Sequence, residues 1–260
     1  MNKSLVNLTV LLNQLNGLRR VKRNSQLDGC VDHYWLDENG AICHEALDYT
    51  PTDIELSEAS TMQSAANYAK TMRGIARQVW RGERINAFPL MWGAVGQGIV
   101  QAWAQGAASC GVSEEELTND ERVRREMIII EQRNHILPFL TWVHTHRRDG
   151  DNKLPWRSIN SRAAMWGNAW NKAYNEGKAR ACANQKLEWV LHGRRVTKEP
   201  CRDCKKLNGR IYRASTWAKW QIFPQSFQLA CKGFNCGCAF KDAEPDERVN
   251  RGRPPKLSGQ

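Results

Sequence analysis

The sequence has no apolar run long enough to cross a membrane, and its first residues lack the pattern of a secretory signal. A transmembrane helix needs about 20 consecutive, predominantly apolar residues. A signal peptide carries positive charge ahead of an uninterrupted apolar core, whereas here Asn7, Asn13 and Asn16 interrupt the leucines and a basic cluster at 19–23 follows them. We therefore expect a protein that folds in the cytoplasm and has no membrane partner.

Acidic residues are scarce relative to basic ones. The chain has 27 Asp and Glu against 38 Lys and Arg, which gives a net charge of +11. Such an excess predicts an anionic partner, and double-stranded DNA is the first candidate. Because the basic residues are spread along the chain, we expect binding without sequence preference. The alternative is a solvated basic surface that has no partner.

No arrangement of residues typical of catalysis is present. His144 and His146 are two residues apart, so on a helix they face different ways, and no glutamate separates them as in a helical metalloprotease. The glycine-rich segment 93–98 follows no hydrophobic strand, so we interpret it as a close helix contact. We expect that the protein is not an enzyme. The alternative is a zinc hydrolase or nuclease in which His192 joins three cysteines.

The first 57 residues divide into two segments. Leucines recur at helical spacing through residues 1–27, which predicts an amphipathic helix that packs on this protein or on a neighbouring subunit. A helix lying on a membrane surface is the alternative. Residues 28–57 predict irregular or short β structure. Adjacent ligands rarely converge on one ion, so we favour buried thiols in this segment over a second metal site at Cys30, His33, Cys43 and His44.

A helical domain is predicted for residues 58–150. Thr118 and Glu121 have the spacing of a capping box, in which each residue satisfies a backbone amide of the other at the start of a helix. The helix that they open should bend or break at Pro138. The polar turn cluster at 149–152 predicts the boundary to the next domain.

Residues 151–240 are predicted to form that next domain, and residues 241–260 a tail. The tail is basic and poor in apolar residues, so we expect a flexible arm. Aromatic residues concentrated at 217–223 predict a partner contact, with packing inside the domain as the alternative. One face of an earlier helix should pack against the cysteine-bearing part of the domain. This face carries Trp166, Trp170, Tyr174, Gly177 and Ala181.

Five of the nine cysteines follow one spacing, Cys201-x-x-Cys204 and then Cys231-x4-Cys236-x-Cys238. Two thiolates separated by two residues can hold one side of a tetrahedral zinc, and a distant close pair completes the other side. A structural zinc supplies about 10 kcal/mol or more of folding free energy to a segment too small for a large core. Since zinc takes four ligands, either Cys231 or Cys238 is spare.

Two disulfides are the alternative use of the same cysteines, because small extracellular domains are stapled in this way. The odd number of clustered cysteines, the missing secretory signal and the isolated cysteines elsewhere, which we expect to be reduced, favour zinc. The sequence therefore predicts an α+β protein that is mostly α-helical, with a small zinc-stapled, β-containing module at its C-terminal end.

Residues 155–240 resemble the C-terminal domain of tailed-phage head morphogenesis proteins, the Mu F-like minor head proteins. The likeness begins with a helix that ends in an A-x-N-x-G pattern, here at 173–177, and a strand with a tryptophan. It departs from the family where Cys231 stands in place of a histidine and Gly237 in place of an arginine. The motifs C-x-x-C-x-x-L-x-G and N-C-x-C are matched by Cys201, Cys204, Leu207, Gly209, Asn235, Cys236 and Cys238.

The resemblance implies a minor head protein that assembles in the host cytoplasm and resides in the virion, at the portal vertex or inside the capsid. Its implied partners are the portal protein and the capsid and scaffold proteins of the procapsid, with contact to packaged DNA as a further expectation. The alternative from a different class is a stand-alone, zinc-stabilised nucleic-acid-binding protein, which the net charge supports.

Overall fold

The computed structural model describes residues 64–83, 86–191, 200–233 and 236–258, together with the backbone of two short strands nearer the amino terminus. These strands, β1 (Tyr34–Leu36) and β2 (Ile42–His44), pair antiparallel, with Trp35 opposite Cys43. Short β structure within 28–57 is therefore confirmed. The predicted helix at 1–27 and the side chains of the suggested second metal site lie outside the described residues.

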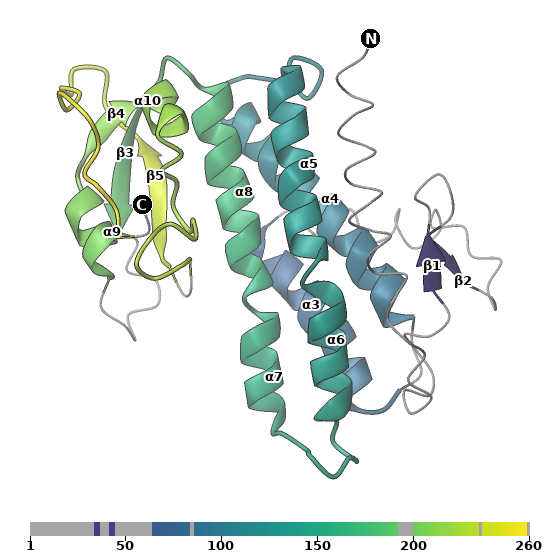
Figure 1. Ribbon diagram of the computed structural model, residues 1–260. Coiled ribbons are helices and arrows are strands. Elements are labelled where there is room, and N and C mark those ends of the chain that lie inside the picture. Colours follow the sequence, from purple (N-terminus) through teal and green to yellow (C-terminus); the bar gives the residue numbers. More distant parts are fainter. Residues whose placement is uncertain are drawn as a thin grey trace.

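Six helices form a helical body, which spans residues 65–181 (Figure 1). Its core contains Met72, Ile99, Trp103, Ile128 and Ile159, all fully buried. No helix in the described part of the chain is both long and apolar enough to span a membrane. The helices are α3 (Ala65–Trp80), α4 (Ala87–Ala108), α5 (Asn119–Arg133), α6 (Ile136–Thr145), α7 (Trp156–Ala163) and α8 (Trp166–Ala181).

The predicted helix signals in the middle of this body are confirmed. Thr118 Oγ1 accepts a hydrogen bond from the Glu121 amide at 3.3 Å, and Glu121 Oε2 accepts one from the Thr118 amide at 2.7 Å. The helix is interrupted between α5 and α6, just before Pro138, so the proline lies in the first turn of α6. Amides of a first helical turn have no partner within the helix, and the missing N–H of proline costs little there.

Helices α4 and α8 touch backbone to backbone at two glycines. A Cβ at Gly106 would lie 2.2 Å from the Tyr174 carbonyl oxygen, and one at Gly177 would lie 2.7 Å from the Trp103 carbonyl oxygen. Gly98, in the glycine-rich segment, lies against the side chain of Tyr68, because a Cβ there would come within 2.6 Å of the ring. This segment is part of α4, as the helix-contact interpretation expects.

Replacing Gly106 with alanine is expected to destabilise the helical body by about 3 kcal/mol, because the new methyl group must push two backbones apart. Gly93 in the same helix is the matched control, since a Cβ there meets nothing within 4 Å. Gly93→Ala should stabilise the protein by roughly 0.5–1 kcal/mol through its better helix propensity. Chemical denaturation of both variants measures the difference, and equal effects of the two would contradict the close contact.

A small antiparallel sheet lies beside α8, on the side opposite α5 (Figure 1). Its strands have the order β4-β3-β5, with Leu187 opposite Tyr212 and Trp189 opposite Phe240. We call residues 186–191, 200–233 and 236–258 the sheet module. Trp189 and Trp217 are fully buried in its separate core. The elements are β3 (Lys186–Leu191), α9 (Arg202–Leu207), β4 (Ile211–Arg213), α10 (Ala214–Lys219) and β5 (Cys238–Asp242).

The mostly helical fold with a small sheet near the C-terminus confirms the predicted class, but the predicted boundary near residue 150 is wrong. Ile159 of α7, and Trp166 and Trp170 of α8, belong to the core of the helical body. The turn at 149–152 only connects two helices of one core. The apolar face of α8 therefore packs against the helices, and the opposite face, with Asn175, contacts the sheet module.

The prediction of a flexible tail is also wrong for residues 241–258. Strand β5 extends to Asp242, and Leu257 is only 2% exposed. Asn250 Oδ1 accepts a hydrogen bond from the Ile211 amide at 2.7 Å, so the tail is bonded to β4. One apolar anchor and backbone hydrogen bonds suffice to hold a segment whose overall composition is polar.

Candidate metal centre

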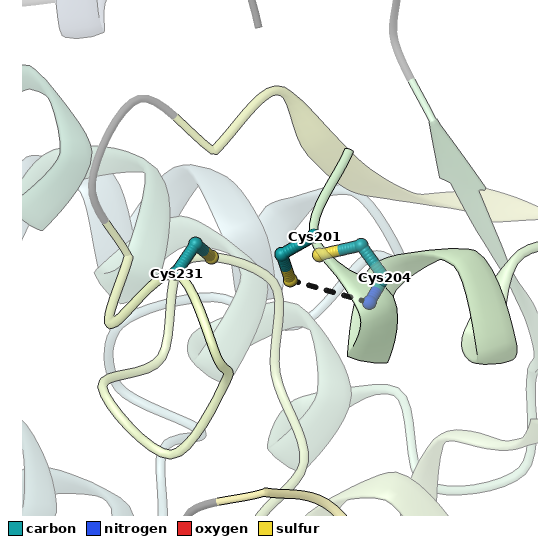
Figure 2. A group of neighbouring side chains, drawn as sticks. All are labelled: Cys201, Cys204 and Cys231. Carbon is teal, nitrogen blue, oxygen red and sulfur yellow. Dashed lines mark hydrogen bonds between the residues drawn. The ribbon is translucent and has the colours of Figure 1, made fainter. Parts of the chain in front are cut away.

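The first pair of cysteines is positioned by the start of α9. Cys201 is the N-cap residue, with an extended backbone, and its sulfur accepts a hydrogen bond from the Cys204 amide at 3.5 Å. Amides at a helix N-terminus lack partners within the helix and favour negative charge nearby. The local fold thus brings Cys201 and Cys204 together on one side of the candidate site (Figure 2).

The other three cysteines come from a loop and from the strand that follows it. Cys231 lies on the loop and faces Cys201 and Cys204 (Figure 2), while Cys238 is the first residue of β5. The loop reverses direction at Gly233, which has φ of +76° and whose Cβ would lie 2.4 Å from the Gln225 carbonyl oxygen. Only glycine fits that position without strain.

The sulfur atoms form two groups that could hold a metal ion such as zinc. In each group all three sulfurs lie within 4.8 Å of one another: Cys201, Cys204 and Cys231 form one, and Cys204, Cys236 and Cys238 the other. The Cys204 and Cys236 sulfurs are 3.8 Å apart. A tetrahedral zinc with Zn–S bonds of about 2.3 Å places its sulfurs about 3.8 Å apart. The thiols therefore fit zinc, and Cys204 is common to both groups.

The thiols lie close enough to form hydrogen bonds with one another, and these bonds shift the pKa values of Cys204 and Cys238 in opposite directions. Hydrogen bonds with Cys231, Cys236 and Cys238 raise the pKa of the Cys204 thiol. Hydrogen bonds from Cys204 and Cys236 lower the pKa of the Cys238 thiol to about 4. The metal ligand is the thiolate, so a bound cation would replace the shared protons, and its binding would release them.

A buried glutamine links the second cysteine pair to α8. Gln225 Nε2 donates to the carbonyl oxygens of Cys236, at 3.1 Å, and Cys238. Its Oε1 accepts from Asn175 Nδ2 at 3.0 Å, and Asn175 Oδ1 accepts from the Phe240 amide at 3.0 Å. Sequence reasoning missed Gln225. Asn175 lies in the A-x-N-x-G pattern, which the resemblance singled out without assigning it a role.

Asp203 joins the loop and the tail beside the cluster. Its buried carboxylate accepts hydrogen bonds from the Ala230 amide at 2.8 Å, and from the Ser258 amide and hydroxyl at 3.1 and 2.8 Å. Burial alone would raise the pKa of Asp203, but the hydrogen bonds from Ser258 and Ala230 hold it below its usual value. The ionised carboxylate therefore holds Ala230, and with it the neighbouring Cys231, close to α9.

The cysteines outside this cluster correct one expectation. Cys110 and Cys182 form a disulfide between the ends of α4 and α8, whereas we expected the isolated cysteines to be reduced. The glycine contacts bring these helix ends together, and the Cα atoms of the two cysteines are 5.6 Å apart. Reduced isolated cysteines therefore no longer favour zinc, whereas the spacing and geometry of the clustered cysteines still do. The five clustered cysteines are free thiols.

The aromatic residues at 217–223 do not form an exposed partner surface, which corrects that expectation. Trp217 is fully buried and Phe223 is 2% exposed. Trp220 is half-buried beneath the Arg253 guanidinium, which lies 4.0 Å from the ring centroid. Trp217 and Phe223 therefore belong to the core of the sheet module, and Trp220 packs against it.

The candidate ligand set in the described part of the chain consists of cysteines alone. His192, the suggested substitute ligand, and Asn235 of the N-C-x-C motif lie outside the described residues. The structure brings all five predicted cysteines to one place, in two groups that share Cys204. No family model, curated protein or solved structure matches this chain.

Proposed function

We propose that this chain is a phage minor head protein whose sheet module is held together by one structural zinc ion. The observation that carries the proposal is the convergence of the motif residues in one small unit. The motif cysteines lie in one cluster, Leu207 is fully buried in the adjoining core, and Gly209 has φ of +72°. The five cysteines, Leu207 and Gly209 of these motifs thus have a structural use in the same unit.

A structural role for the zinc follows from the ligand set. Four thiolates fill a tetrahedral ion and leave no position for an activated water, which a hydrolytic zinc site requires. The ion would instead tie α9, the Cys231 loop and β5 together. We therefore propose that the protein is not an enzyme and that it acts through binding, with the portal protein and with capsid or scaffold proteins of the procapsid.

Co-expression with the portal protein encoded nearby, together with mass spectrometry of purified procapsids and virions, tests this function. We expect the two proteins to co-purify and the chain to be present in particles. Its presence in procapsids but not in virions would indicate a role limited to assembly. Absence from both, without co-purification, would overturn the proposal.

The net charge of +11 supports a second candidate, a stand-alone nucleic-acid-binding protein. Against it, several basic side chains are paired in ion pairs, among them Arg125 with Glu114 and Lys178 with Asp242. Titration of duplex DNA at several salt concentrations separates the candidates. Weak binding that falls steeply with salt fits a head protein with incidental DNA contact. Tight, sequence-selective binding would favour the second candidate.

A further inference from the structure

A groove with a volume of about 450 Å³ lies between the helical body and one loop of the sheet module. One wall comes from α5, α6, α7 and α8. The other wall is the loop that precedes the second cysteine pair, with Phe227 and Lys232. The floor is apolar, and its residues Phe139, Trp166 and Ala169 are at most 8% exposed.

An exposed aromatic ring marks the edge of the groove. Phe227 is 68% exposed, more than any other large hydrophobic residue that the structure describes as exposed. The other aromatic residues that the structure describes in the sheet module are buried in its core or packed against it, so Phe227 is unusual in its own surroundings. Large aromatic side chains concentrate binding energy at protein interfaces. An apolar floor beside such a ring is suited to an apolar side chain of a partner.

The charges around the groove are mainly positive. Lys172 is paired with Glu131 at 3.1 Å, so these two neutralise each other. Arg162 and Lys232 are exposed and have no carboxylate partner among the described residues. The Arg162 guanidinium stacks on Trp142, 4.5 Å from the ring centroid, which fixes its position. Two cations therefore flank an apolar floor.

We propose that this groove binds a segment of a partner protein in which an apolar or aromatic side chain is flanked by acidic residues. The apolar side chain would lie on the floor beside Phe227, and the carboxylates would pair with Arg162 and Lys232. A nucleic-acid strand fits less well, because its phosphates would face an apolar floor, the Glu131 carboxylate and only two unpaired cations. The inference rests on the proposed function, in which the partner is a portal or capsid subunit.

The groove depends on the candidate metal centre, because one of its walls is a loop that the centre holds in place. Gln225 bonds the start of this loop to the carbonyl oxygens of Cys236 and Cys238, and Cys231 lies next to Lys232. Removing the metal should therefore abolish binding in the groove even though the helical wall remains folded.

Selection from a library of random peptides on the full-length, zinc-loaded protein tests the proposal without any phage component. We expect enrichment of peptides with an aromatic or leucine residue flanked by Asp or Glu. Enriched peptides, labelled with fluorescein, should bind Phe227→Ala and Arg162→Glu at least about tenfold more weakly than the original protein. Lys219→Glu, at an exposed position of α10 outside the groove, is the matched control for charge and should bind normally.

Two checks make the result decisive. The zinc content of each variant should equal that of the original protein, since Phe227 and Arg162 are exposed. The melting temperature should change little, because Arg162→Glu loses only a stacking contact with Trp142 that contributes about 1 kcal/mol or less. Enrichment of basic peptides, or binding that both groove variants leave unchanged, would overturn the proposal. Displacement of the peptides by an oligothymidine at similar concentration would assign the groove to nucleic acid. Failure here would leave the portal co-purification test of the proposed function unaffected.

Discussion

Replacing Cys204 with serine is expected to abolish zinc binding and to unfold the sheet module, while the helical body stays folded. Cys204 belongs to both groups of sulfur atoms, so its loss leaves neither group complete. A structural zinc contributes about 10 kcal/mol or more to a small domain, and a core of this size cannot replace that contribution. The helices should persist, because their core is separate and includes Trp103 and Ile128.

Metal analysis and hydrogen exchange measure this outcome. The original protein, purified with its clustered thiols reduced, should carry about one zinc per chain, and Cys204→Ser none. Amides in 186–191 and 200–242 should lose protection in the variant, and those of α3 to α8 should keep it. Chelation of zinc from the original protein should reproduce the same pattern.

Serine at Cys231 or at Cys238 provides the matched comparison. Zinc takes four ligands and the cluster has five thiols, so one of these two variants should retain zinc and a folded module. This result would identify the spare cysteine. A metal-free original protein with five free thiols, whose melting curve does not respond to chelation, would remove the metal centre altogether.

Replacing Glu176 with alanine is expected to destabilise the helical body by about 3 kcal/mol. Its carboxylate is fully buried and bonds Arg124 of α5 at 2.7 Å and Arg180 of α8 at 3.0 Å. Breaking a buried ion pair costs about 3–5 kcal/mol, because the remaining charge loses its partner. The arginine side chains are 30% and 23% exposed, so water compensates them in part and the lower value applies.

The pKa of Arg124 reflects the same interaction. Burial lowers this pKa, but the hydrogen bond and the charge of Glu176 raise it above its ordinary value. Glu83→Ala is the matched control, because its ion pair with Arg81 is about half exposed on both sides. Exposed pairs contribute less than about 1 kcal/mol. Similar losses in urea denaturation for the two variants would show that Glu176 is not a buried anchor.

Helix α8, which carries Glu176, also reaches the part of the protein that holds the candidate metal centre. Helix α8 carries Trp170 into the core of the helical body, Glu176 toward α5, and Asn175 toward Gln225 and β5. One helix therefore contacts both parts of the protein with different faces. A variant that tilts α8 would disturb the groove between them, whereas loss of zinc would disturb only the module side.

Several features followed from the sequence because their physical cause is local. The C-x-x-C spacing predicted that Cys201 and Cys204 lie on one side of a site, since two intervening residues form a single turn. Thr118 and Glu121 predicted a helix start, because a capping box needs only neighbouring residues. The glycine-rich segment was correctly assigned to a helix contact, because no hydrophobic strand precedes it and no acidic residue follows at the distance that a nucleotide-binding loop needs. In the first two cases the interacting groups are a few residues apart in the chain.

Only the tertiary structure decided the features that depend on residues far apart in the chain. Helices α7 and α8 belong to the helical core because their apolar faces pack against α3 and α4. The turn residues at 149–152 give no indication of this packing. The disulfide joins residues 72 positions apart, and Gln225 meets Asn175 across 50. Composition predicted a free tail, yet Leu257 is buried. The periodicity of a sequence indicates that a face is apolar, but the partner of that face is set by packing of the whole chain.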